Sequence, residues 1–189
     1  MTDTPVLTRP PFDPELEPLL PVIAEALPTT IKPEHIQSLR DAPLAELTPE
    51  MISEAGLETR DVTIPGYQGA PIEMTIIQPR GRTGTGPGFF HTHGGGMIFG
   101  DRMSGVTALF EWLTRYNAVA VTVEYRLAPE HPDPVPVEDS YAGLVWMAEH
   151  ADELGVDPAK IITIGGIAGG GLAAAITLLF VMTLIGYLI

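Results

Sequence analysis

The sequence predicts an α/β fold with a mostly parallel sheet, flanking helices and a helical segment at the N-terminus. From residue 85 onward, apolar runs typical of strands alternate with segments of helical periodicity, which predicts parallel strands joined by right-handed crossovers. Residues 118–125 are nearly all β-branched or small, as in a strand buried on both faces. With 189 residues, 45% of them hydrophobic, the chain can bury one sizeable core.

The N-terminal part, residues 1–45, is predicted to be an arm followed by two short amphipathic helices. The first helix has apolar residues at helical spacing, at Leu16, Leu19, Leu20, Ile23 and Leu27. The second is expected around residues 33–40, where Thr30 precedes it as a candidate cap. Together these helices form a small unit that comes before any strand.

Residues 46–175 are predicted to form the α/β domain, and residues 176–189 an apolar tail. Residues 61–80 read as a hairpin, because apolar and polar residues alternate on both sides of a Gly-rich turn. The remaining elements follow in order: strand 88–93, loop 93–100, helix 104–116, strand 118–125, loop 127–136, helix 138–150 and strand 161–164. The last strand is expected at an edge of the sheet.

Charge and cysteine content exclude several classes of function. A formal net charge of −14 leaves too few cations to neutralise a nucleic-acid backbone, so no nucleic-acid partner is expected. The absence of cysteine excludes disulfides, thiolate metal sites and a cysteine nucleophile. No basic segment followed by an apolar core stands at the N-terminus, so no signal peptide is expected and a cytoplasmic location is the default.

Three motifs occur in order along the α/β segment. HGGG at residues 93–96 follows a strand, and its glycines let backbone N–H groups approach a developing oxyanion; an ordinary Gly-rich surface loop is the alternative. YRLAPEHPDP at 125–134 directly follows another strand. IITIGGIAGGG at 161–171 is a buried run, a tight turn and the start of a helix, which is the pattern of a nucleophile elbow.

These motifs, in this order, resemble those of the hormone-sensitive-lipase-like carboxylesterases and lipases of the α/β-hydrolase fold. The resemblance covers about residues 60–175 and implies hydrolysis of a small ester with a modest acyl chain, without a metal or organic cofactor. It also implies that the two N-terminal helices cap the acyl pocket. The fold expected is therefore a partial α/β-hydrolase fold with an N-terminal helical cap.

The resemblance also assigns individual residues. Gly95, Gly96 and Ala168 match the oxyanion-hole donors, while His93 and Gly94 belong to the motif that shapes the loop. For the acidic residues Glu130 and Asp139, the resemblance implies structural roles, in which they hold the loop after the 118–125 strand.

Ile167 occupies the position of the nucleophile. Isoleucine has neither a lone pair nor a proton to give up, so covalent catalysis there is excluded. A β-branched residue is also strained at positive φ, so the turn is expected to relax away from elbow geometry. In this fold the acid and the base follow the nucleophile along the chain, whereas the last histidine and the last acid, His150 and Asp157, precede it. We therefore expect a C-terminally incomplete, inactive esterase.

Other polar residues offer weaker chemistry. His91 and His93 are two residues apart on a predicted strand, a spacing at which they could share a metal, but no third ligand is evident and no metal site is predicted. The serines have no neighbouring base in the sequence and are interpreted as surface or capping hydroxyls; they are Ser38, Ser53, Ser104 and Ser140.

The C-terminal segment allows two interpretations. No charged residue occurs from Ile161 to Ile189, and residues 172–189 would extend about 27 Å as a helix, close to the thickness of a hydrocarbon core. The segment is either a buried or unpaired helix or a contact with a membrane. The alternative to a degenerate esterase is therefore a non-catalytic binding or membrane-anchored protein. Nothing in the sequence indicates an oligomeric state.

Overall fold

The computed structural model describes residues 10–26, 30–41 and 47–186. The chain divides into two compact units, Met1–Ser38 and Leu39–Ile189. The first unit contains the helix α1 (Leu20–Ala26), which a short 3-10 helix precedes. The second helix, α2 (Ile36–Arg40), begins near the end of the first unit and continues into the second. Both predicted N-terminal helices are therefore present; Leu27, assigned to the first of them, lies outside the described residues. Their role as a cap over the acyl pocket stays a prediction.

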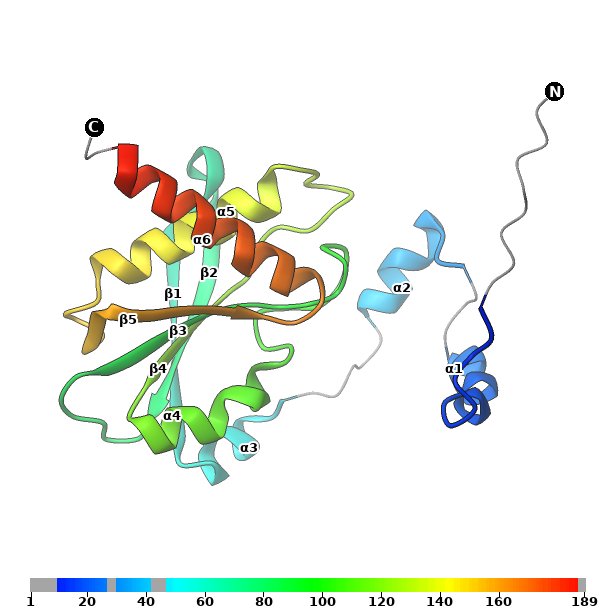
Figure 1. The fold of residues 1–189 in the computed structure, drawn as a ribbon, viewed down its shortest axis with the longest axis horizontal. Coiled ribbons are helices and arrows are strands. Elements are labelled where there is room, and N and C mark those ends of the chain that lie inside the picture. The colour runs from blue at the N-terminus through cyan, green and yellow to red at the C-terminus, as the bar shows by residue number, and fades with distance from the viewer. Residues whose placement is uncertain (1–9, 27–29, 42–46, 187–189) are drawn as a thin grey trace. The chain divides into compact units, whose positions relative to one another are not determined.

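The second unit is built on a five-stranded mixed sheet with the strand order β1-β2-β4-β3-β5 (Figure 1). β1 and β2 form the predicted antiparallel hairpin, and β2 also pairs antiparallel with β4. β3 runs parallel to both β4 and β5, as the alternation of strands and helices predicted. The strands are β1 (Leu57–Pro65), β2 (Pro71–Pro79), β3 (Gly86–Thr92), β4 (Val119–Val123) and β5 (Val156–Gly165).

Helices cover both faces of this sheet (Figure 1). α3 (Pro49–Glu54) and α4 (Phe110–Tyr116) contribute to the apolar cluster on one face, and α5 (Val135–Glu149) and α6 (Ala168–Gly186) to the cluster on the other. α3 begins at an N-cap, where the Thr48 side chain accepts a hydrogen bond from the Met51 N–H.

The starts of α5 and β5 were predicted too late along the chain. α5 begins at Val135 rather than at residue 138, because Pro136 stands in its first turn, where a fixed φ favours the helix and the missing N–H costs nothing. β5 begins at Val156 rather than at residue 161. Its first residue already pairs with Gly86, across a register shift from the main ladder.

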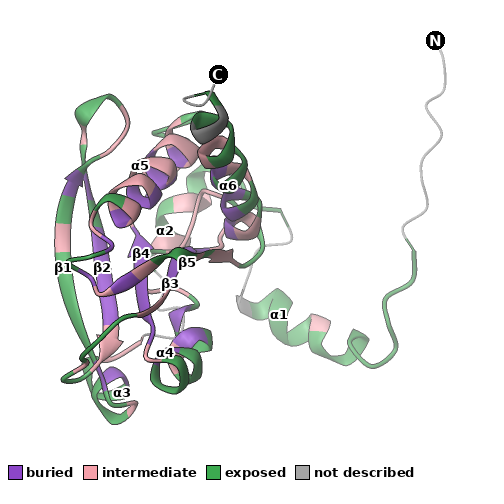
Figure 2. Ribbon diagram, turned by 60° about the vertical axis from the view of Figure 1, so that its left-hand side comes forward, coloured by how far each residue is buried: buried purple, intermediate pink, exposed green. Residues whose placement is uncertain are grey.

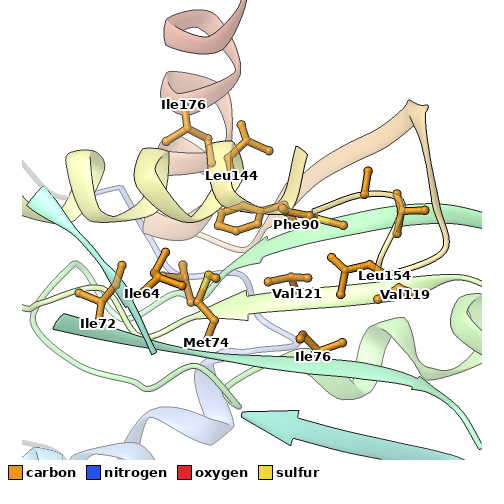
Figure 3. Close-up of a cluster of buried hydrophobic side chains, with 14 of the residues drawn as sticks. Ile64, Ile72, Met74, Ile76, Phe90, Val119, Val121, Leu144, Leu154 and Ile176 are labelled. Carbon is orange, nitrogen blue, oxygen red and sulfur yellow. The ribbon is translucent and has the colours of Figure 1, made fainter. Parts of the chain in front are cut away.

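Alternation along the strands divides the core between the two faces of the sheet. Phe90, Val121 and Ile76 lie in the cluster under α5 and α6, where Figure 3 shows Leu144 and Ile176 of those helices facing them. Their chain neighbours lie in the cluster under α3 and α4; these are Phe89, Ala120 and Ile77. Successive residues of a strand point to opposite faces, so β3, β4 and β2 are each apolar on both.

The centre of the sheet is more deeply buried than the edge formed by β5 (Figure 2). All five residues of β4 are buried, as its composition predicted. β5 is the last strand in the order of the sheet, and the Ile162 side chain is 47% exposed. The prediction that this strand forms an edge is confirmed.

α6 is apolar around its whole circumference but only partly buried. Leu172, Ala173 and Ile176 are buried, while Leu178 and Met182 are each 60% exposed. The Tyr141 hydroxyl of α5 donates a hydrogen bond to Thr183 Oγ1 of α6, at 2.9 Å. Among the described helices, none is both long and apolar enough to cross a membrane. The alternative that residues 172–189 contact a membrane rests on the sequence alone.

Candidate active site

The connection between β5 and α6 has the shape of a nucleophile elbow. β5 ends at Gly165 and α6 begins at Ala168, and between them Ile167 has φ +54° with its side chain 92% exposed. The prediction that the turn relaxes away from elbow geometry was therefore wrong. Ile167 adopts a backbone conformation that is unfavourable for a β-branched residue, at a cost on the order of 1–3 kcal/mol.

The residues around Ile167 explain why the turn keeps its shape. A Cβ atom on Gly165 would lie 2.6 Å from the Thr92 carbonyl oxygen, and one on Gly169 would lie 2.5 Å from the His93 carbonyl oxygen. The Thr92 hydroxyl also donates a hydrogen bond to the Gly169 carbonyl oxygen, at 2.7 Å. The end of β3 and the elbow thus pack backbone against backbone, and the Ile167 side chain takes no part in this contact.

The HGGG loop lies against the elbow. A Cβ atom on Gly94 would be 3.1 Å from the Gly166 carbonyl oxygen. Gly95 has φ +112° and Gly96 has φ +67°, which glycine adopts at no steric cost. Within the described residues, the N–H groups of Gly95, Gly96 and Ala168 donate no hydrogen bond to another protein group. The fold of the described residues therefore leaves these three N–H groups without a hydrogen-bond acceptor.

His93 holds this loop through hydrogen bonds of its ring and its backbone. Its ring is fully buried and stacks on Tyr125 with 4.1 Å between ring centroids. Nδ1 lies 2.8 Å from the Gly94 carbonyl oxygen, to which it donates, and the Tyr125 hydroxyl donates to the His93 carbonyl oxygen, also at 2.8 Å. Burial lowers the pKa of His93 and raises the pKa of Tyr125, so both are neutral near pH 7.

A cavity of about 460 Å³ lies between the loop and the elbow. Of the residues predicted to form the site, Gly94, Gly95 and Ile167 line it, whereas His93, Gly96 and Ala168 do not. Apolar side chains make up much of the remaining wall, at Phe99, Ala108, Leu109 and Ile164. The cavity wall therefore combines glycine backbone with apolar side chains.

His91 also lines the cavity, although the sequence suggested for it only a metal shared with His93. It pairs in register with Thr122 of β4, and its Nδ1 lies 3.0 Å from Thr122 Oγ1. Burial, with a smaller effect of His93, lowers the pKa of His91 from its usual 6.5 to about 4. No group of three or more side chains within the described residues could hold a metal ion.

Two acidic residues hold the loop that follows β4. Asp139 is fully buried, and its carboxylate accepts hydrogen bonds from Arg126 Nε at 2.8 Å and from the Tyr67 N–H at 2.9 Å. Glu130 pairs with Arg40 at 2.9 Å, and this hydrogen bond lowers the pKa of Glu130. These contacts match the structural roles that the resemblance implied for both residues.

The hydroxyl of the serine in the cavity wall is already engaged in a hydrogen bond. Ser104 lines the cavity, but its hydroxyl donates a hydrogen bond to the Asp101 carboxylate at 2.9 Å. Ser140 donates to the Pro136 carbonyl oxygen inside α5. Ser38 likewise donates to a backbone carbonyl oxygen, that of His35. These three hydroxyls therefore have structural partners.

A mixed sheet covered by helices on both faces, with an HGGG loop packed against an elbow, is the arrangement of an α/β hydrolase. A family profile described as alpha/beta hydrolase fold matches residues 89–185. The chain belongs to the α/β-hydrolase fold family.

Its relatives are carboxylesterases. A carboxylesterase of Mycobacterium tuberculosis is 34% identical over 164 residues, which are 85% of this chain and 50% of that protein. An arylesterase of Saccharolobus solfataricus is 34% identical over 170 residues, 89% of this chain and 55% of that protein. The chain thus spans about half the length of the curated relatives it matches.

Solved structures give the same family. An esterase from the archaeon Pyrobaculum calidifontis superposes with a TM-score of 0.69 at 32% identity, over 89% of this chain and 54% of that one. Brefeldin A esterase, described as a bacterial homologue of human hormone sensitive lipase, superposes with a TM-score of 0.62 at 30% identity, over 92% of this chain and 47% of that one. The resemblance to hormone-sensitive-lipase-like esterases is confirmed.

Proposed function

We propose that this chain binds a small ester or acyl ligand in the site of a carboxylic ester hydrolase and has no serine-dependent turnover. The observation that carries this proposal is Ile167, which stands exposed on the elbow, at φ +54°, in the wall of the cavity beside the HGGG loop. The turn has the backbone shape of a nucleophile elbow, and the residue at the position of the nucleophile cannot react.

The backbone amides support ligand binding. The N–H groups of Gly95, Gly96 and Ala168 are free within the described residues and would donate to the carbonyl oxygen of an ester, or more strongly to an oxygen that carries negative charge. Ala108, Leu109 and Ile164 would contact a modest acyl chain. Binding of this kind needs neither a metal nor an organic cofactor.

The side chains around the cavity support the absence of turnover. Within the described residues, the wall contains one histidine, His91, and no carboxylate. The Nδ1 atom of His91 is engaged with Thr122, and the hydroxyl of Ser104 with Asp101. Removing the nucleophile of a serine hydrolase lowers turnover by about 10⁶-fold where it has been measured, and positioned amides alone replace little of this.

The test of turnover is hydrolysis of p-nitrophenyl butyrate by the wild-type chain and by Ile167→Ser, with Ile167→Ala as the control for a small residue without a hydroxyl. We expect all three to match the buffer rate. Turnover by the wild type above buffer would overturn the proposal. Turnover by Ile167→Ser alone would show that a base serves position 167.

The test of binding is a titration with ethyl butyrate followed by amide NMR. We expect shifts at the amides of Gly95, Gly96 and Ala168, and none at Gly171, which is further along α6 and has nothing within 4 Å of its Cβ position. An ester that leaves the first three amides unchanged would contradict the ester-binding part of the proposal.

A further inference from the structure

His91 presents an unpaired ring nitrogen to the cavity. The side chain is 5% exposed and lies in the cavity wall. Its Nδ1 points to Thr122 of the neighbouring strand, and Nε2 lies 3.8 Å from the position of a Cβ on Gly105, another residue of the same wall. Within the part of the chain that the structure describes, Nε2 makes no hydrogen bond.

The hydrogen bonds of Thr122 decide which ring nitrogen carries the proton. The Thr122 hydroxyl has one hydrogen, and it donates this hydrogen to the Arg102 carbonyl oxygen, 2.5 Å away. Because a carbonyl oxygen cannot donate, Thr122 Oγ1 can only accept from His91, so Nδ1 bears the proton. The Nε2 atom then has a free lone pair.

The loop that supplies this carbonyl is anchored firmly. The Arg102 backbone N–H donates to Glu124 Oε2 at 2.9 Å, and the Arg102 guanidinium donates to Thr75 Oγ1 at 2.8 Å and pairs with Glu73 at 3.0 Å. The Arg102 carbonyl oxygen is therefore fixed, and with it the proton on His91. The low pKa of His91, about 4, keeps the ring neutral near pH 7.

We infer that His91 Nε2 is a hydrogen-bond acceptor that selects, for this cavity, acyl ligands carrying a hydroxyl or amide N–H group. The remaining wall is made of glycine backbone and apolar side chains, apart from the engaged Ser104. A ligand donor that reaches Nε2 gains a hydrogen bond, whereas an ether or alkyl group at the same place leaves the nitrogen unpaired. This inference rests on the proposal that the cavity binds an acyl ligand.

The first measurement needs no ligand. A long-range proton–nitrogen NMR spectrum of the wild-type protein at pH 7 reports which imidazole nitrogen is protonated. We expect a protonated Nδ1 and an unprotonated Nε2 for His91. A proton on Nε2 would overturn the inference, whatever the ligand results.

The second measurement compares ligands with and without a donor. Ethyl 3-hydroxybutyrate and ethyl 6-hydroxyhexanoate are each titrated against their methoxy analogues, with ethyl butyrate as the reference ester. We expect at least one hydroxyl ester to bind about 5-fold more tightly than its methoxy analogue. Equal binding of both pairs, with ethyl butyrate still bound, overturns the role of His91 and leaves the proposed function standing. If no ester binds, the proposed function fails and the inference fails with it.

Three variants distinguish the effect of the His91 ring nitrogen from the effect of the shape of the cavity wall. His91→Phe keeps a planar ring and leaves the Thr122 hydroxyl bonded to Arg102, and we expect each hydroxyl ester and its methoxy analogue to bind this variant with equal affinity. Thr122→Val removes the partner of Nδ1 and should let the proton redistribute over both ring nitrogens. Ser104→Ala, whose hydroxyl is already engaged, is the matched control and should keep the preference. If His91→Phe keeps it, His91 is not the acceptor.

Discussion

The two sides of the cavity differ in the groups that they present. On the loop side, Gly95 and Gly96 have positive φ, and their N–H groups donate no hydrogen bond within the described residues. On the elbow side, Gly165 and Gly169 pack against the backbone of β3, and the exposed residue between them is Ile167, whose side chain cannot act as a nucleophile. The elbow geometry of this protein therefore comes from contacts between its glycines and β3, in which the side chain at position 167 takes no part.

The largest effect is expected where the elbow meets β3. A Cβ on Gly169 would collide with the backbone of Thr92 and His93, whereas one on Gly171, two residues along the same helix, meets nothing within 4 Å. Gly169→Ala should lower the free energy of unfolding by about 3 kcal/mol. Gly171→Ala should raise it by about 0.5–1 kcal/mol, because glycine is the poorer helix former. Urea unfolding measures both, and equal effects would contradict the role of the contact.

Glycine-to-alanine substitutions in the HGGG loop should also lower the free energy of unfolding, by smaller amounts. A Cβ on Gly95 would lie 2.6 Å from the Phe99 carbonyl carbon at φ +112°, while Gly96, at φ +67°, has open space around it. Gly95→Ala should cost about 2–3 kcal/mol and Gly96→Ala about 1 kcal/mol. Thermal unfolding of the two variants checks this order, and the reverse order would show that the loop can rearrange.

A lower pH should decrease the free energy of unfolding, because His91 is buried in its neutral form. Its pKa falls from 6.5 to about 4 in the fold, so the unfolded chain binds the proton more readily. The stability associated with the neutral ring is complete above pH 6.5 and is lost as the pH falls toward 4, by about 2 kcal/mol between pH 7.5 and pH 5.

His91→Phe lacks this titration, so its free energy of unfolding should fall by about 2 kcal/mol less than that of the wild type over the same interval. His93, whose pKa is also lowered by burial, remains in both proteins and cancels in the comparison. Equal pH dependence of the two proteins would contradict a neutral, buried His91.

The smallest effect concerns the strain at the elbow. Ile167 is 92% exposed, so its replacement removes little packing. Asparagine tolerates positive φ, and Ile167→Asn should therefore raise the free energy of unfolding by about 1 kcal/mol. Ile162→Asn, at an exposed position in β5, is the control and should bring no gain. If Ile167→Asn is no more stable than the wild type, the turn carries no strain at this residue.

Local patterns predicted most of the fold. The alternation in residues 61–80 predicted the β1–β2 hairpin, and the β-branched composition of residues 118–125 predicted the buried strand β4, because each signal lies within a single element. The glycines of HGGG and of the elbow likewise indicated the two sides of the site. The start of α5 was misplaced because a proline in the first turn of a helix reads, in sequence, like a loop.

Contacts between distant residues were not predictable in this way. Ile167 alone suggested a relaxed turn, and the contact that prevents it joins Gly169 to Thr92 and His93, more than 70 residues away in sequence. His91 could not be placed in the cavity wall without the register that pairs it with Thr122. The proton on its ring depends on the carbonyl of Arg102, a third separate segment.

The exposed edge of the sheet also affects how the protein behaves in concentrated solution. β5 pairs only with β3 within the described residues, so one row of its backbone donors and acceptors faces outward and can pair with another copy. The net charge of −14 opposes such encounters between copies. At 1 M salt the screening length falls to about 3 Å, and this repulsion is lost. Handling at low ionic strength and low concentration therefore keeps the chain dispersed.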